Sequence, residues 1–139
     1  MLKTIIGIVV GVCLCSAQAF SETREEELVR LSKLTISAFE CSVLTDGDDA
    51  KLAFFVGLKA GEGLWDGLRK LSTDEVRTIG PKIDKLWGMV KGGTTTEFVL
   101  GGAYEAIREE VAKSAVRYGE NWYERRQNMY KEKNCVQFR

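Results

Sequence analysis

The sequence predicts an all-α fold: a small single-domain bundle of about four helices with one disulfide, following a cleaved N-terminal signal peptide. Apolar residues recur at three- and four-residue spacing along most of the chain, which is the period of helices that face a core. Turn dipeptides between alternating apolar and polar runs, the mark of β-hairpins, are absent from the sequence. Two cysteines remain beyond residue 19, which is enough for one disulfide in an exported protein.

The first 19 residues predict export. Lys3 supplies a positive start, residues 4–14 are almost purely apolar, and Ala17 and Ala19 form a small-residue cleavage site. The apolar run is shorter than the roughly 20 residues of a membrane-spanning helix, so a retained anchor is the weaker alternative. Lipid attachment fits less well, because Cys13 and Cys15 follow bulky residues. We expect residues 1–19 to be the signal peptide, residues 20–139 to be the helical domain, and the protein to be periplasmic or secreted.

Composition limits the chemistry of the mature chain. Cleavage leaves 120 residues, enough for one core, and removes Lys3 alone, so that 19 basic and 20 acidic residues remain. This balance argues against a nucleic-acid partner, because such proteins carry a clustered basic surface. The chain contains no histidine, which is both the commonest general base at neutral pH and the commonest metal ligand. We therefore predict no enzyme activity, no cofactor and no metal.

The mature cysteines are Cys41 and Cys135, and we predict that they form one intramolecular disulfide. It would close a loop of 94 positions, for which chain entropy alone gives roughly 4–5 kcal/mol of stabilisation. A redox-active pair is the weaker alternative, since the sequence has no C-x-x-C motif.

The first predicted helix begins near Thr23, which forms a capping box with Glu26, and its apolar stripe runs to Cys41. A turn at residues 45–48 follows, with Gly47 suited to a left-handed C-cap and Asp48 to an N-cap. Residues 46–49 resemble a fragment of a calcium loop, but Gly57 stands where the closing glutamate would fall, so a capped turn is the better interpretation.

The second predicted helix covers about residues 49–71 and is rich in glycine. Each glycine costs about 1 kcal/mol relative to alanine inside a helix, so the fold must offset that cost. Close helix packing is the first explanation, and a shallow groove for a ligand or partner is the second. The predicted binding groove consists of Gly57, Gly61, Trp65, Gly101 and Gly102.

Two further helices complete the expected bundle. The third starts at Ser72 with a capping box to Glu75, is kinked or split at Gly80-Pro81, and ends at residues 92–93. The fourth starts with a Thr94–Glu97 capping box and continues to about residue 133. Its roughly 57 Å would exceed a compact domain of this size, so it should bend, break near Gly119 or project.

Catalytic constellations are scarce. Without histidine, the common nucleophilic triads cannot form, and the remaining enzymatic candidate is the carboxylate pair of Glu62 and Asp66 beside Trp65. Carboxylates at this spacing usually lie on a solvated helix face, which is the interpretation that we favour.

We therefore expect an exported, non-enzymatic protein that binds another macromolecule, most simply a protein, as an inhibitor, an immunity or exclusion factor, or an accessory subunit. Membrane contact is compatible with this role but not required. In size, export and one cysteine pair, the chain is similar in outline to acid-stress chaperones and secretion-system immunity proteins. The alternatives are an acid-stress chaperone and a small-ligand or lipid-binding module with a cleft lined by Trp65, Trp87 and Trp122. A cavity of several hundred cubic ångströms lined by these tryptophans would favour the ligand-binding module.

Overall fold

The protein is all-α, as predicted. The computed structural model describes residues 22–84, 87, 95–117 and 121–139, so the predicted signal peptide and the predicted helix end at residues 92–93 lie outside the described residues. The described part contains five α-helices and two short 3₁₀ helices. In chain order they are α1 (Arg24–Leu44), α2 (Gly47–Leu68), α3 (Thr73–Ile79), η1 (Gly80–Lys82), α5 (Thr96–Arg117), α6 (Trp122–Glu132) and η2 (Cys135–Phe138).

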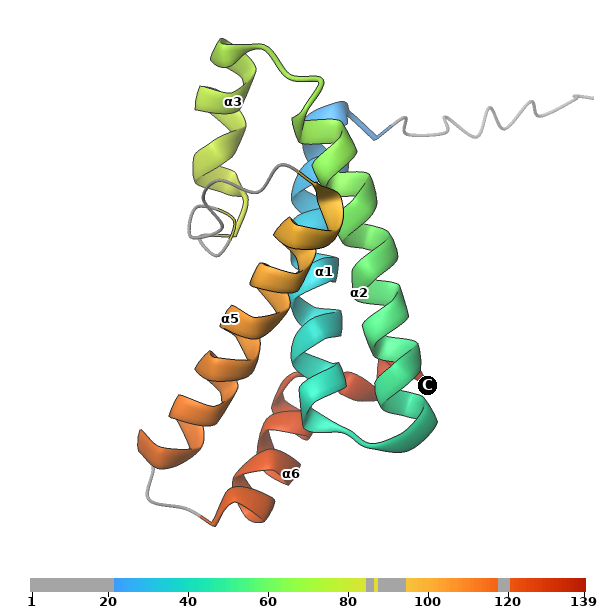
Figure 1. Ribbon diagram of the computed structural model, residues 1–139, viewed down its shortest axis with the longest axis vertical. Coiled ribbons are helices and arrows are strands. Elements are labelled where there is room, and N and C mark those ends of the chain that lie inside the picture. The colour runs from blue at the N-terminus through green and yellow to red at the C-terminus, as the bar shows by residue number, and fades with distance from the viewer. Residues whose placement is uncertain (1–21, 85–86, 88–94, 118–120) are drawn as a thin grey trace, which may run out of the picture.

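The centre of the fold is a hairpin of two long helices, α1 and α2, which lie side by side (Figure 1). Helix α5 crosses this hairpin, and α6 packs near the end where α1 runs into α2 (Figure 1). The main core lies among these four helices, around the fully buried ring of Phe39. Phe39 stacks on Phe54 at 5.7 Å and meets Tyr104 edge-on at 5.3 Å between ring centroids, so one aromatic cluster joins α1, α2 and α5.

Two of the predicted capping boxes are present. Thr23 and Glu26 cap α1 reciprocally, and Ser72 and Glu75 cap α3 in the same way. The start of α5 differs from the prediction, because Thr95 Oγ1 accepts a hydrogen bond from the Phe98 N–H at 3.3 Å. The capping role that we assigned to position 94, which lies outside the described residues, is thus filled by the next threonine.

The turn between α1 and α2 is tighter than predicted. Gly47 has a φ of +65°, the left-handed conformation expected of it. However, α2 begins at Gly47 itself, so the N-cap is Asp46 and the prediction of Asp48 was wrong. Asp46 makes no capping hydrogen bond with its side chain, because its carboxylate pairs with Arg126 of α6 at 2.7 Å.

The third and fourth predicted helices are both interrupted. Pro81 lies in η1, and Ile83 is extended, so the element that starts at Ser72 splits where proline was expected to split it. The long fourth helix is two helices, α5 and α6, and Asn121 caps the second by accepting from the Tyr123 N–H. The expected break at Gly119 falls between them, at a position outside the described residues.

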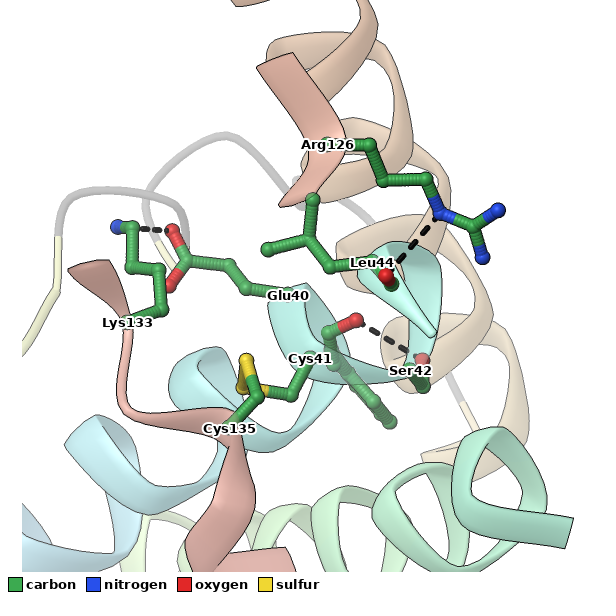
Figure 2. The surroundings of a disulfide bond; sticks show 8 residues. Glu40, Cys41, Ser42, Leu44, Arg126, Lys133 and Cys135 are labelled. Carbon is green, nitrogen blue, oxygen red and sulfur yellow. Dashed lines mark hydrogen bonds and ion pairs between the residues drawn. A yellow bond between two sulfur atoms is a disulfide. The ribbon is translucent and has the colours of Figure 1, made fainter. Parts of the chain in front are cut away.

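The predicted disulfide between Cys41 and Cys135 is present, and both cysteines are buried. Figure 2 shows that it joins α1 to the start of η2, with the Lys133–Glu40 ion pair beside it at 2.8 Å. On the other side of the bond, Arg126 donates to the carbonyl oxygens of Leu44 at 3.0 Å and Thr45 at 2.6 Å. The last turn of α1 carries no basic residue of its own, so Arg126 supplies the cation that complements its dipole.

Candidate apolar cleft

The structure does not bring the five residues of the predicted groove together. Gly57 and Gly61 are buried, and a Cβ at Gly57 would lie 2.5 Å from the Phe39 ring. A Cβ at Gly61 would collide with the side chain of Leu100. These two glycines therefore allow α1 and α5 to pack closely on α2, which is the first of the two explanations offered for the glycine-rich helix.

The other three residues of the predicted groove are less buried than Gly57 and Gly61. Gly101 and Gly102 are exposed on α5, and nothing lies within 4 Å of a Cβ built at Gly101. Trp65 is half-buried near the end of α2, where it lines a cleft with a different set of neighbours. Ligand binding at the glycines stays a prediction, whereas Trp65 lines a cleft that the structure defines.

That hollow, the apolar cleft, lies between the end of α2 and the α3–η1 segment. Its volume is about 670 Å³, within the range of about 300–1,000 Å³ that is typical of small-molecule sites. Figure 1 shows that α3 lies to one side of the α1–α2 hairpin. The wall of the cleft that α3 contributes is therefore not part of the hairpin. The lining residues are Trp65, Leu68, Val76, Gly80, Pro81, Ile83, Asp84 and Trp87.

Local sequence explains how these side chains reach the cleft. Trp65 and Leu68 are three residues apart on α2 and so share one helix face. On the opposite wall, Ile79 is buried with Leu28 and Leu64 in a second core cluster, which anchors the end of α3. Pro81 then ends the α-helix, and the extended backbone at Ile83 carries the chain along the rim.

A buried hydroxyl holds the far wall in place. Ser32 of α1 is fully buried, and its Oγ accepts hydrogen bonds from the Asp84 N–H and from the Trp87 Nε1–H, both at 3.0 Å. Lys82 also pairs with Glu25 of α1. The segment after η1 is thus attached to α1 by polar contacts, while its apolar side chains face the cleft.

The polar groups of the cleft are few. Among the lining residues that the structure describes, Asp84 is the one charged residue. The Trp87 indole N–H is already bonded to Ser32. Trp65 Nε1 is buried and has no hydrogen-bond acceptor among the described residues. The described lining therefore offers mainly apolar surface, including two indole rings.

Other candidates from the sequence lie elsewhere. Asp66 is exposed, and Glu62 is partly exposed with Lys59 as an ion partner at 3.9 Å, so both acids lie on the outer surface of α2. Trp122 lies on α6 with 43% of its surface exposed, far along the chain from the two cleft tryptophans. Of the three tryptophans expected around one cavity, two share it.

Sequence reasoning missed most of the cleft. Val76, Pro81 and Ile83 fall within the third predicted helix without being assigned to a cleft, and Ser32 was not singled out at all. The available signal was a serine spaced four residues from Leu28 and from Ile36 on one helix, together with a tryptophan after a proline break. Such a pair predicts a buried hydroxyl that satisfies an indole, but no spacing rule connects two residues 55 positions apart.

Neither metal binding nor membrane insertion is suggested by the residues that the structure describes. They contain no group of three or more acidic, cysteine or histidine side chains that could hold a metal ion. None of the helices among them is long and apolar enough to cross a membrane.

Comparison of the chain with protein-family models, with curated proteins and with solved structures found no match.

Proposed function

We propose that the protein is an exported, non-enzymatic binding protein that takes up a small apolar ligand in the cleft between α2 and α3. The observation that carries this proposal is the volume of about 670 Å³ lined by Trp65, Trp87 and aliphatic side chains. Burial of apolar ligand surface contributes roughly 25 cal/mol per Å², so a cleft lined mostly by apolar side chains can supply affinity for an apolar ligand. Export rests on the signal-peptide pattern of residues 1–19.

Tryptophan fluorescence tests this function directly. A dodecyl chain that carries bromine at its end and a neutral hydroxyl head, 12-bromododecanol, quenches an indole when the bromine lies in contact with it. We expect saturable quenching of the oxidised mature protein. The expectation rests on the two indoles in the cleft.

Matched variants show which of the three tryptophans is quenched. The Trp122→Phe variant leaves only the cleft indoles and should retain the quenching, because Trp122 lies on α6. The double variant Trp65→Phe, Trp87→Phe leaves only Trp122 and should lose it, while circular dichroism checks that the helices persist. Equal quenching in both variants, or none in the wild type, would refute ligand binding in the cleft.

A second candidate function, docking of a partner protein, is favoured by a different surface. Leu52 and Phe55 on α2 are 46% and 60% exposed, and beside Phe55 lies an open hollow of about 490 Å³. Large apolar side chains exposed together are typical of interaction sites. Substitution of Phe55 by serine should abolish capture of a partner from an envelope extract and leave the cleft quenching unchanged.

A further inference from the structure

We infer that the protein forms a symmetric dimer in which the exposed face of α2 packs antiparallel against the same face of a second copy. This inference rests on the second candidate function, docking at Leu52 and Phe55, and it names the partner. It is independent of ligand binding in the apolar cleft. Three features of α2 lead to it: an uncovered apolar pair, opposite charges on its two sides, and a hollow beside it.

One face of α2 is covered, and the opposite face is open. Figure 1 shows that α1 and α5 lie on the same side of α2, which forms an edge of the described bundle. Gly57 and Gly61 are buried and pack against these two helices. Leu52 and Phe55 lie on the open face and are 46% and 60% exposed. Two large apolar side chains together on an open face are typical of a surface that a partner covers.

The apolar pair is held in position before any partner binds. Phe55 meets the ring of Phe54 edge-on at 6.0 Å between centroids, and Phe54 packs against the main core. Beside Phe55 lies the open hollow of about 490 Å³, whose lining includes Val56 and Leu58. Because little side-chain freedom remains to be lost, this face is suited to association with a rigid surface such as another helix.

The charges on either side of the pair make the face complementary to itself. Asp48 lies four residues before Leu52, and Lys59 lies four residues after Phe55, so the two charges are equally far from the centre of the pair. This spacing keeps all four residues on one helix face. A two-fold axis through that centre reverses the helix and brings Asp48 of each copy beside Lys59 of the other. Leu52 of one copy then lies opposite Phe55 of the other, between the two ion pairs.

Both charged side chains are available for these contacts. Asp48 is 96% exposed, and Lys59 is 87% exposed. Within one copy they pair with Lys51 at 2.9 Å and with Glu62 at 3.9 Å. Exposed ion pairs of this kind contribute little to stability, so they exchange readily for pairs with a second copy.

Sedimentation equilibrium of the oxidised mature protein measures the association. We expect a monomer–dimer equilibrium with a dissociation constant of about 100 μM, because interfaces below about 1,200 Å² generally give weak complexes. Phe55→Ser should raise that constant about tenfold or more, since it removes a central apolar contact from both copies. A protein that stays monomeric at about 1 mM would overturn the inference. Docking of a different protein at this face, tested by capture, and ligand binding in the cleft would still stand.

Charge reversal tests the antiparallel arrangement itself. Asp48→Lys and Lys59→Glu each replace both attractions across the axis by repulsions, so each variant alone should associate about fivefold to tenfold more weakly. Mixing the two variants restores both pairs, and the mixture should form dimers as well as the wild type does. Equal association of the mixture and of the separate variants would overturn the antiparallel packing.

A control and a second measurement complete the test. Asp66→Lys makes the same charge change at an exposed position of α2 beyond the apolar pair, and it should leave association unchanged. Circular dichroism checks that each variant is folded, because Asp48→Lys places a cation in the first turn of α2. If that variant does not fold, about 0.5 M sodium chloride should weaken the wild-type dimer about threefold by screening the two ion pairs. An unchanged dissociation constant in salt would contradict the role of Asp48 and Lys59.

Discussion

Ser32 shows how one buried side chain determines the shape of the cleft. Its hydroxyl oxygen accepts two hydrogen bonds from the wall that contains Asp84 and Trp87. Buried polar groups are rarely left without partners, so the indole N–H of Trp87 constrains where that wall can lie. The position of the second indole in the cleft thus depends on a residue that is not part of the cleft.

Substitution of Ser32 by alanine should therefore destabilise the protein by about 1–3 kcal/mol, because the Asp84 and Trp87 N–H groups would lose their common acceptor. Urea unfolding followed by circular dichroism measures the change. Ser37→Ala is the matched control on the same helix, at a half-buried position where alanine, the better helix former, should cost little. Equal losses in the two variants would show that the hydrogen bonds of Ser32 contribute nothing specific.

The features that could be predicted at this scale are those with partners close in sequence. The Thr23–Glu26 and Ser72–Glu75 boxes span three residues each, so a local pattern is sufficient to identify them. The Cys41–Cys135 bond was predictable because only two cysteines lie beyond the predicted signal peptide. Ser32 and Trp87 are 55 positions apart, and nothing local indicates that they meet. The ion pair between Asp46 and Arg126 was not predicted for the same reason, since Arg126 belongs to a distant helix.

At the scale of helices, the glycines of α2 and α5 differ in whether a neighbouring helix packs against them. Gly57 and Gly61 face side chains of α1 and α5 at distances that leave no room for a methyl group. Gly101 is exposed on α5 and faces open space. Sequence alone could not separate the two cases, because both groups lie in apolar, glycine-rich helical segments. The distinction depends on which helix face is covered, and that is a property of the assembled bundle.

We expect Gly57→Ala to lower the free energy of unfolding relative to Gly101→Ala by about 1–3 kcal/mol. The new methyl group at position 57 would press on the rigid Phe39 ring, and overpacking of this kind costs about that much. Gly101→Ala should stabilise the protein by up to about 1 kcal/mol, because alanine is the better helix former and meets no neighbour. Thermal unfolding of both variants decides the matter, and a stabilised Gly57→Ala protein would contradict the packing described above.

At the scale of the whole molecule, we expect carboxylates to determine how folding stability depends on pH. The sequence has no histidine, so no side chain with an ordinary pKa near 6.5 is present. Hydrogen bonds to the Thr23 backbone and hydroxyl lower the pKa of Glu26, and those to Ser72 lower the pKa of Glu75 in the same way. The Arg126 guanidinium lowers the pKa of Asp46. All three groups are therefore more acidic in the folded than in the unfolded chain.

A depressed folded-state pKa adds stability above the unfolded pKa, and this stability disappears as the pH falls through the folded value. We therefore expect the melting temperature to vary little between about pH 5.5 and pH 8 and to fall below about pH 4, the ordinary range of carboxyl groups. Asp46→Asn should make the acid side of the melting curve shallower, whereas Lys51→Gln, on the exposed face of α2, should not. A drop centred near pH 6.5 would contradict this account.

Acid unfolding also bears on the proposal of an acid-stress chaperone. Loss of the Asp46–Arg126 pair would weaken the attachment of α6 to the end of α1, and the core residue Met129 lies on α6. Binding of 1-anilinonaphthalene-8-sulfonate below pH 4 would support that proposal, and a fold unchanged at pH 3 would remove it.

The disulfide has a consequence for resistance to proteolysis. Because Cys41 and Cys135 are 94 positions apart, the covalent loop that they close includes α2, α3, α5 and α6. A protease that cuts the chain once within this loop does not separate the pieces, since each piece remains attached through one of the cysteines. The nicked molecule keeps its parts at a very high local concentration and can re-form its core after the cut.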